Sequence, residues 1–181
     1  MSSMDQLYQQ LILEHAKNPH GRGLLPGGAG ESFQVNPTCG DEVRLRVHLA
    51  PGTAGGDPVV DRVSWEGQGC SISQASLSVL SELVAGAPMT TVEELGETFR
   101  ELMRSRGKGL DDRAEDLLGD ATAFTGVSQY PARIKCALLG WAALRDALAQ
   151  AGSPDHAVPA PSDQTAAAEG APSAPSHQED R

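Results

Sequence analysis

Val43-Arg44-Leu45-Arg46-Val47-His48-Leu49 alternates apolar and polar residues without a break. This period of two is typical of a β-strand with one buried and one solvated face. A turn rich in Gly and Pro around residues 51–58 follows, and Val59 to Trp65 forms a second apolar run. The two runs predict an antiparallel hairpin, with His48 on the solvated face of its strand.

Helical periodicity dominates on both sides of this hairpin. Upstream, Leu7, Leu11 and Ile12 share one face of a helix predicted from Ser3 to about Lys17. Downstream, the apolar spacing predicts four more helices, which begin after Cys70, near Thr91, at Asp112 and at Pro131. Helices on either side of a few strands predict an α+β domain, with helices packed on one face of a small antiparallel sheet of about three strands.

Composition divides the chain into a folded part and a tail. Residues 1–151 are predicted to form one domain, because 181 residues with 39% hydrophobic content can bury one core. Residues 152–181 are rich in Ala, Pro, Ser and Gly and carry several acidic residues. Such a segment buries too little apolar surface to offset an ordering entropy of roughly 1–2 kcal/mol per residue, so it is predicted to be a disordered tail.

Charge and hydropathy exclude several functions. A formal net charge of −10 argues against a nucleic-acid partner, which needs clustered Lys and Arg. No apolar run is long enough to span a bilayer, so no membrane association is expected. The first residues show no basic region followed by an apolar stretch, so no secretory signal is visible. With unpaired cysteines, these features predict a cytoplasmic protein.

The three cysteines are the main candidates for chemistry. Cys39 follows Asn36-Pro37-Thr38 and precedes Gly40-Asp41, and Cys70 follows Gly67-Gln68-Gly69. Three thiolates with the carboxylate of Asp41 make a tetrahedral set for zinc or for cluster iron. Cys70 and Cys136 are both predicted near helix N-termini, where the macrodipole favours thiolates. From spacing alone, three inert buried cysteines remain an equal alternative, and Asp41 remains a candidate turn residue.

Several motifs in order give a more specific answer. They are Glu14-His15-x-Lys17-Asn18-Pro19, Asn36-Pro37-Thr38-Cys39-Gly40-Asp41, Gly67-x-Gly69-Cys70-Ser71-Ile72-Ser73 and the helix around Cys136. With them, almost the whole predicted domain resembles the U-type iron–sulfur assembly proteins, the IscU/SufU superfamily with NifU N-terminal-like domains.

Within that superfamily the chain is more similar to SufU than to IscU. IscU-type proteins carry a histidine directly before the third cysteine, where this chain has Lys135. Their chaperone-docking motif is also replaced, by residues 129–134 with the sequence QYPARI. The 65 residues between Cys70 and Cys136, with a helical segment from Thr91 to Arg106, resemble the SufU insertion.

The resemblance implies a zinc-dependent sulfurtransferase. It implies zinc held by Cys39, Asp41, Cys70 and Cys136, and persulfide sulfur accepted on Cys39 from a pyridoxal-phosphate cysteine desulfurase of the SufS type. In the family, a histidine of that partner replaces the first cysteine on zinc, and an arginine near the site corresponds to Arg133. Downstream SUF scaffold proteins are candidate further partners.

Two other functions remain open. One is an IscU-like scaffold that assembles a [2Fe–2S] cluster on the same ligands. The other is an interaction module with a structural zinc ion and no chemistry. Lys135 favours sulfur transfer over the scaffold, and the carboxylate of Asp41 argues against a purely structural zinc site, whose ligands are usually thiolate and imidazole.

Overall fold

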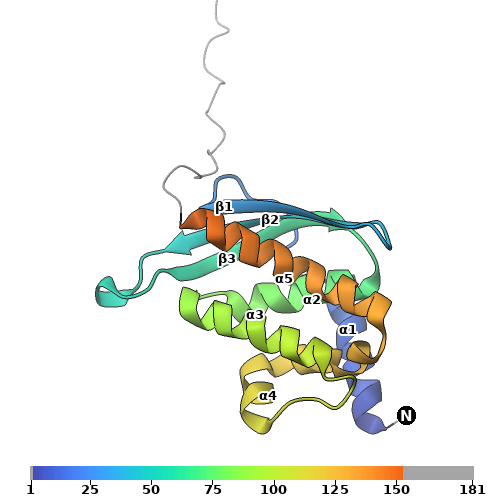
Figure 1. Ribbon diagram of the computed structural model, residues 1–181. Helices are drawn as coiled ribbons and strands as arrows, with labels where there is room; N and C mark the ends of the chain where they lie inside the picture. Colours follow the sequence, from blue (N-terminus) through green and yellow to red (C-terminus); the bar gives the residue numbers. More distant parts are fainter. Residues whose placement is uncertain (1, 153–181) are drawn as a thin grey trace, which may run out of the picture.

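The computed structural model describes residues 2–152 (Figure 1). The predicted tail lies outside the described residues, apart from Gly152. In chain order the elements are α1 (Ser3–Lys17), β1 (Gly30–Asn36), β2 (Asp41–Ala50), the 3₁₀ turn η1 (Thr53–Gly55), β3 (Val59–Gln68), α2 (Ser71–Val84), β4 (Ala87–Pro88), α3 (Met89–Arg104), α4 (Asp112–Leu118), the 3₁₀ segment η2 (Gly119–Gln129) and α5 (Pro131–Ala151). The α+β class is therefore confirmed.

The strands form one antiparallel sheet in the order β1-β2-β3-β4, and the helices lie on one of its faces (Figure 1). The predicted alternation of β2 is confirmed, because Val43, Leu45 and Val47 are fully buried against the helices. His48 is half-buried on the other face and bonds Ser64 Oγ through Nε2. Its pKa is lowered by burial and by the charge of Arg62, against the opposing charge of Asp61.

The sheet has four strands, where about three were predicted, and the sequence pattern showed neither β1 nor the two-residue β4. Strand β1 has an unusual pattern. Its helix-facing positions include the polar residues Ser32 and Asn36, whereas Phe33 and Val35 are exposed. This reverses the usual hydrophobic pattern of a half-buried strand. Polar side chains are tolerated on the inner face because they have partners, such as Asp146 of α5, whose Oδ2 accepts a 2.6 Å hydrogen bond from Ser32 Oγ.

Helix α5 packs across β1 and β2 and joins the sheet to the other helices. Within the core, the ring of Trp141 on α5 stacks on Phe99 of α3, with centroids 4.8 Å apart and an interplanar angle of 18°. The first turns of α2 and α5 and the turn between β1 and β2 lie at the same end of the molecule (Figure 1). All three predicted site cysteines are at that end. Within residues 2–152, none of the helices is long and apolar enough to cross a membrane.

Candidate metal centre

Cys39 lies in the turn that joins β1 to β2, and Asn36 shapes this turn. The Asn36 side-chain Oδ1 accepts a hydrogen bond from the Thr38 backbone N–H at 3.1 Å, and the Asn36 carbonyl accepts one from Gly40 N–H at 2.8 Å. Gly40 has a φ of 73°, a left-handed conformation that favours glycine. The turn therefore holds Cys39 as an exposed thiol.

Asp41 is the first residue of β2 and has the same phase as Val43, so its carboxylate points to the buried, helix-facing side of the sheet. Only 3% of its surface is exposed. Oδ1 accepts a 3.2 Å hydrogen bond from the backbone N–H of Cys70, whereas Oδ2 is buried and has no hydrogen-bond partner among residues 2–152. A buried carboxylate oxygen without a partner is costly, and a cation would satisfy it.

Cys70 is the N-cap residue of α2, so the prediction that it directly precedes this helix is confirmed. The preceding Gly69 is required by packing. A Cβ at this position would lie 2.9 Å from Asp41 Cγ, closer than real Cβ contacts, and closer still to Ser73 Oγ. Gly69 therefore lets the start of α2 approach the carboxylate.

Cys136 is the buried thiol of the group and comes from the second turn of α5. Its Sγ is 3.4 Å from Cys39 Sγ. Asn36 Nδ2 donates to Cys136 Sγ at 3.8 Å, and the Cys136 thiol donates to the Ala132 carbonyl at 3.7 Å. Three elements that are distant in sequence thus place their polar atoms around one point.

The start of α5 was expected to favour a thiolate at Cys136, but this is wrong: the surroundings of the thiol favour its protonated form. Burial raises the pKa of the Cys136 thiol well above its ordinary value, and the adjacent thiols of Cys39 and Cys70 and the Asp41 carboxylate raise it further. The helix N-terminus does not compensate, because Cys136 is the sixth residue of α5, beyond the turn whose N–H groups are free. Burial also acts to raise the pKa of Asp41, but the neighbouring thiols, above all that of Cys39, lower it overall.

The lowered pKa of Asp41 and the raised pKa of Cys136 are consistent with a metal site. One carboxylate and one buried thiol cannot both ionise easily at this distance without a positive charge between them, and a bound cation deprotonates a coordinating thiol. The side chains of Cys39, Asp41 and Cys136 each offer one ligand atom, and these three atoms lie within 4.8 Å of one another. Two sulfurs and an oxygen are ligands that zinc accepts.

The structure brings three of the four predicted ligands together and leaves the Cys70 thiol at the edge of the group. Cys70 Sγ is outside the set of mutually close ligand atoms, yet this thiol is near enough to affect the pKa of both Asp41 and Cys136. Arg133 is exposed on the first turn of α5, three residues before Cys136 and therefore on a neighbouring part of the helix surface.

Sequence reasoning gave no role to Asn36, although this residue contacts both the turn and Cys136. The signal was present in the sequence, because Asn36-Pro37 followed closely by Gly40 is typical of a turn. What could not be read is that the same side chain reaches a cysteine that is 100 residues away in the sequence.

An α+β domain that gathers three cysteines and an aspartate at one end of its sheet is the arrangement expected of the IscU/SufU superfamily. The chain belongs to this class of proteins: residues 7–137 match the model of the family described as NifU-like N terminal domain.

Individual relatives agree with the family. The chain is 41% identical over 152 residues to the zinc-dependent sulfurtransferase SufU of Bacillus subtilis, and the alignment covers 82% of this chain and 94% of that protein. It is 32% identical over 157 residues to the iron–sulfur cluster assembly scaffold protein IscU of Streptococcus pyogenes, covering 86% and 91% of the two chains.

Solved structures show the same fold. A protein of Fervidobacterium islandicum, described as a candidate iron–sulfur cluster assembly scaffold for the SUF system, is 33% identical with a TM-score of 0.66, over 81% of this chain and 99% of that one. A NifU-like protein (N-terminal) of Brucella abortus is 25% identical with a TM-score of 0.68, over 83% and 97% of the two chains.

Proposed function

We propose that this protein is a zinc-dependent sulfurtransferase of iron–sulfur cluster assembly, which accepts sulfur on Cys39 from a SufS-type cysteine desulfurase in the cytoplasm. The observation that carries the proposal is the pairing of an exposed thiol, Cys39, with a buried thiol and a buried carboxylate oxygen that lacks a partner. The 41% identity to a zinc-dependent sulfurtransferase supports the same reading.

Cys39 is the proposed acceptor because it alone of the three cysteines is exposed. A sulfur donor on another protein must bring its terminal sulfur within bonding distance of the acceptor, which a buried thiol does not allow. The turn of Cys39 belongs to a hairpin, whereas Cys136 is fixed within α5 and Cys70 caps α2. Movement of the acceptor therefore requires only a change in the turn.

The transfer is a thiol exchange without net oxidation or reduction. The Cys39 thiolate attacks the terminal sulfur of the donor persulfide, a new S–S bond forms at Cys39, and the S–S bond of the donor breaks. The electron pair of the broken bond stays on the donor cysteine, which leaves as a thiolate. The terminal sulfur, with its proton if it carries one, stays on Cys39.

The residues around Cys39 divide the remaining work. Asp41, Cys70 and Cys136 would hold zinc together with Cys39, and zinc supplies the positive charge that keeps these thiols deprotonated. Arg133 would place its guanidinium beside the negatively charged persulfide, because it is exposed at the same end of α5. Lys135, also exposed on this turn, adds a second positive charge.

The test is mass spectrometry of the purified protein after incubation with a SufS-type desulfurase and cysteine, with the added sulfur mapped by peptide. We expect added sulfur on the peptide that contains Cys39. Cys39→Ser should abolish it, and Arg133→Gln should slow its appearance while the zinc content stays at the wild-type level. Cys70→Ser is the matched control: it should lower the zinc content and still leave an exposed acceptor thiol.

Three outcomes would contradict the proposal. Added sulfur on Cys70 or Cys136 with Cys39 unmodified would refute the choice of acceptor. If no sulfur is added although zinc is bound and the desulfurase is active, the protein is instead an interaction module with a structural zinc ion. A brown protein that contains iron after anaerobic purification would identify a cluster scaffold, the function for which the Streptococcus pyogenes relative is named.

A further inference from the structure

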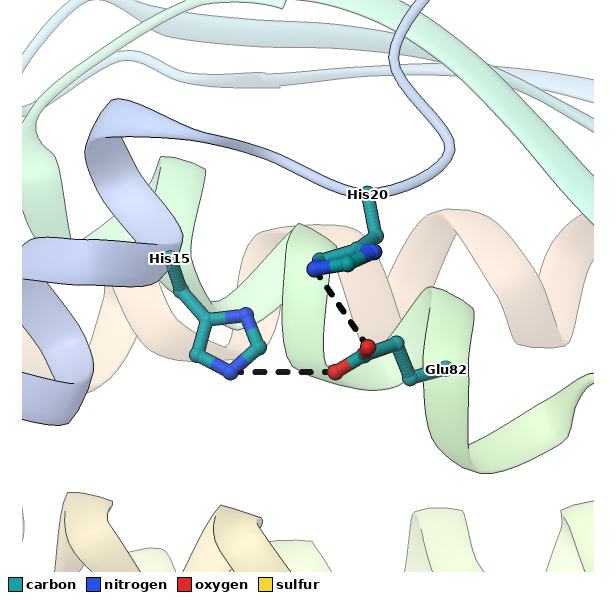
Figure 2. A group of neighbouring side chains, drawn as sticks. All are labelled: His15, His20 and Glu82. Carbon is teal, nitrogen blue, oxygen red and sulfur yellow. Dashed lines mark ion pairs between the residues drawn. The ribbon is translucent and has the colours of Figure 1, made fainter.

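A second group of metal-binding side chains lies away from the cysteines (Figure 2). It consists of His15 at the end of α1, His20 just after this helix, and Glu82 near the end of α2. His15 Nε2 is 3.7 Å from Glu82 Oε2, and His20 Nε2 is 3.3 Å from Glu82 Oε1. Figure 2 shows both imidazole rings turned toward the one carboxylate, each facing a different oxygen.

The fold holds the two histidines in place. Asn18 caps the end of α1 and Pro19 redirects the chain, which brings the ring of His20 to 5.6 Å from that of His15, centroid to centroid. Ser78 Oγ accepts a hydrogen bond from the His20 backbone N–H at 2.8 Å and lies 2.7 Å from His15 Nδ1. The His20 carbonyl in turn accepts a 2.9 Å hydrogen bond from Trp65 Nε1.

The contact with Ser78 has a consequence for His15. Metal-binding histidines commonly donate their second ring N–H to an outer partner, which fixes the tautomer and aims the other nitrogen at the metal. When Ser78 Oγ accepts from Nδ1–H, the unprotonated Nε2 presents its lone pair to the Glu82 carboxylate; in the other tautomer, Ser78 O–H donates to Nδ1 and Nε2–H faces the carboxylate. In the first tautomer two electron-rich atoms face each other, and a positive charge, either a proton or a metal ion, stabilises them.

We propose that His15, His20 and Glu82 form a second divalent metal site, one that takes zinc or a similar first-row ion through two imidazole nitrogens and the Glu82 carboxylate. Ligands about 2.0–2.1 Å from a tetrahedral zinc ion lie roughly 3.3 Å apart, which matches the separation of His20 Nε2 from Glu82 Oε1, whereas His15 Nε2 lies 3.7 Å from Oε2. The two imidazoles favour the later first-row ions over magnesium or calcium.

Entry of an ion is open from the solvent. The side chain of His15 is buried, but the side chains of His20 and Glu82 are 53% and 45% exposed. His20 and Glu82 also line a surface pocket of 340 Å³. Three protein ligands with a free fourth position are typical of zinc sites that keep a water molecule or bind a small ligand.

The second site is separate from the cysteine site. Cys70 precedes the first residue of α2 and Glu82 is in its last turn, so the two are about 18 Å apart along a helix that rises 1.5 Å per residue. The histidine site contains no sulfur, so it would exchange its metal more readily than the thiolate site and would not compete with it for soft ions.

The experiment is a titration of the full-length protein with Zn²⁺, followed by NMR of the histidine ring nitrogens. We expect a zinc-dependent shift of the His15 and His20 ring signals, with the signals of His48 unchanged. His20→Asn and Glu82→Gln should each weaken this binding by roughly tenfold or more, at least the loss that follows from removing an outer partner of a metal ligand. Both positions are partly exposed, so neither change should unfold the protein.

His48→Asn is the matched control, because His48 is a half-buried histidine bonded to a serine and belongs to no group of close metal ligands among residues 2–152. This variant should bind zinc at His15 and His20 as the wild type does. The readout is specific to residues, so it stands whether or not the cysteines bind metal. Ring signals of His15 and His20 that respond to pH but not to saturating Zn²⁺ would show a proton-linked ion pair and overturn the proposal, as would equal binding in His20→Asn.

Discussion

Gly69→Ala offers a sharp test of the cysteine–aspartate centre, because it adds one methyl group beside the carboxylate and removes no ligand. The new Cβ would lie 2.9 Å from Asp41 Cγ and 3.1 Å from Asp41 Cβ, whereas ordinary contact begins at 3.4 Å. The carboxylate must therefore retreat by about 0.5 Å. Ser73 can rotate its hydroxyl away, but Asp41 is buried and its Oδ1 is bonded to Cys70 N–H.

Overpacking of this kind costs about 1–3 kcal/mol. Because the strain falls on a proposed ligand, we expect zinc affinity to fall about tenfold or more, which corresponds to about 1.4 kcal/mol. The apo protein should lose stability by an amount within the same range. Competition with a chromophoric zinc chelator measures the affinity, and urea unfolding of the apo protein measures the stability.

Gly126→Ala is the matched control. A Cβ at Gly126 meets no atom within 4 Å, and its backbone is not in the left-handed region. The substitution should leave zinc affinity unchanged and alter stability by less than about 1 kcal/mol, in the stabilising direction, because alanine restricts the unfolded chain. Wild-type zinc affinity in Gly69→Ala, or an equal loss in both variants, would refute the argument that Gly69 is needed to fit Asp41 into a metal site.

Two further predictions concern the acidic residues at the start of β2 and in β1. Asp41→Ala should keep the fold but lower the zinc content and alter desulfurase stimulation; if both stay at the wild-type level, Asp41 has only a structural role at the start of β2. For Glu31, burial acts to raise the pKa, but hydrogen bonds from Arg46 and Arg44 lower it below its ordinary value of 4.5. A lowered carboxyl pKa adds stability above the unfolded value, and this stability is lost as the pH falls through the folded value. Glu31→Gln should therefore reduce the free energy of unfolding at neutral pH, and the difference from the wild type should shrink as the pH falls below the ordinary glutamate value of 4.5, when both are unfolded with urea.

The local elements could be predicted because each one depends on its own residues. The alternation from Val43 to Leu49 gave the phase of β2, and the same phase counted back two residues places Asp41 on the buried side. Pro131 starts α5, as expected for a residue with a fixed φ and no N–H to satisfy. The motifs around the cysteines gave the family, because their residue types and order are specific.

Strand β1 and the contacts within the site depend on residues far apart in the chain. Ser32 and Asn36 face inward because Asp146 and Cys136 of α5 provide their partners, a fact that no local pattern contains. The raised pKa of Cys136 likewise follows from burial next to Cys39, although position in the helix suggested the opposite. A proton affinity depends on every charge and dipole near the group, so it is set by tertiary packing.

The sequence by itself determined the α+β class, and its motifs indicated the family and implied the four proposed ligands, because these depend on residue types and their order along the chain. Only the tertiary structure decided which thiol is exposed, which carboxylate oxygen lacks a partner, and that His15 and His20 meet Glu82. Those properties depend on burial and on distances between elements separated by tens of residues. Such distances are fixed by how the helices pack on the sheet.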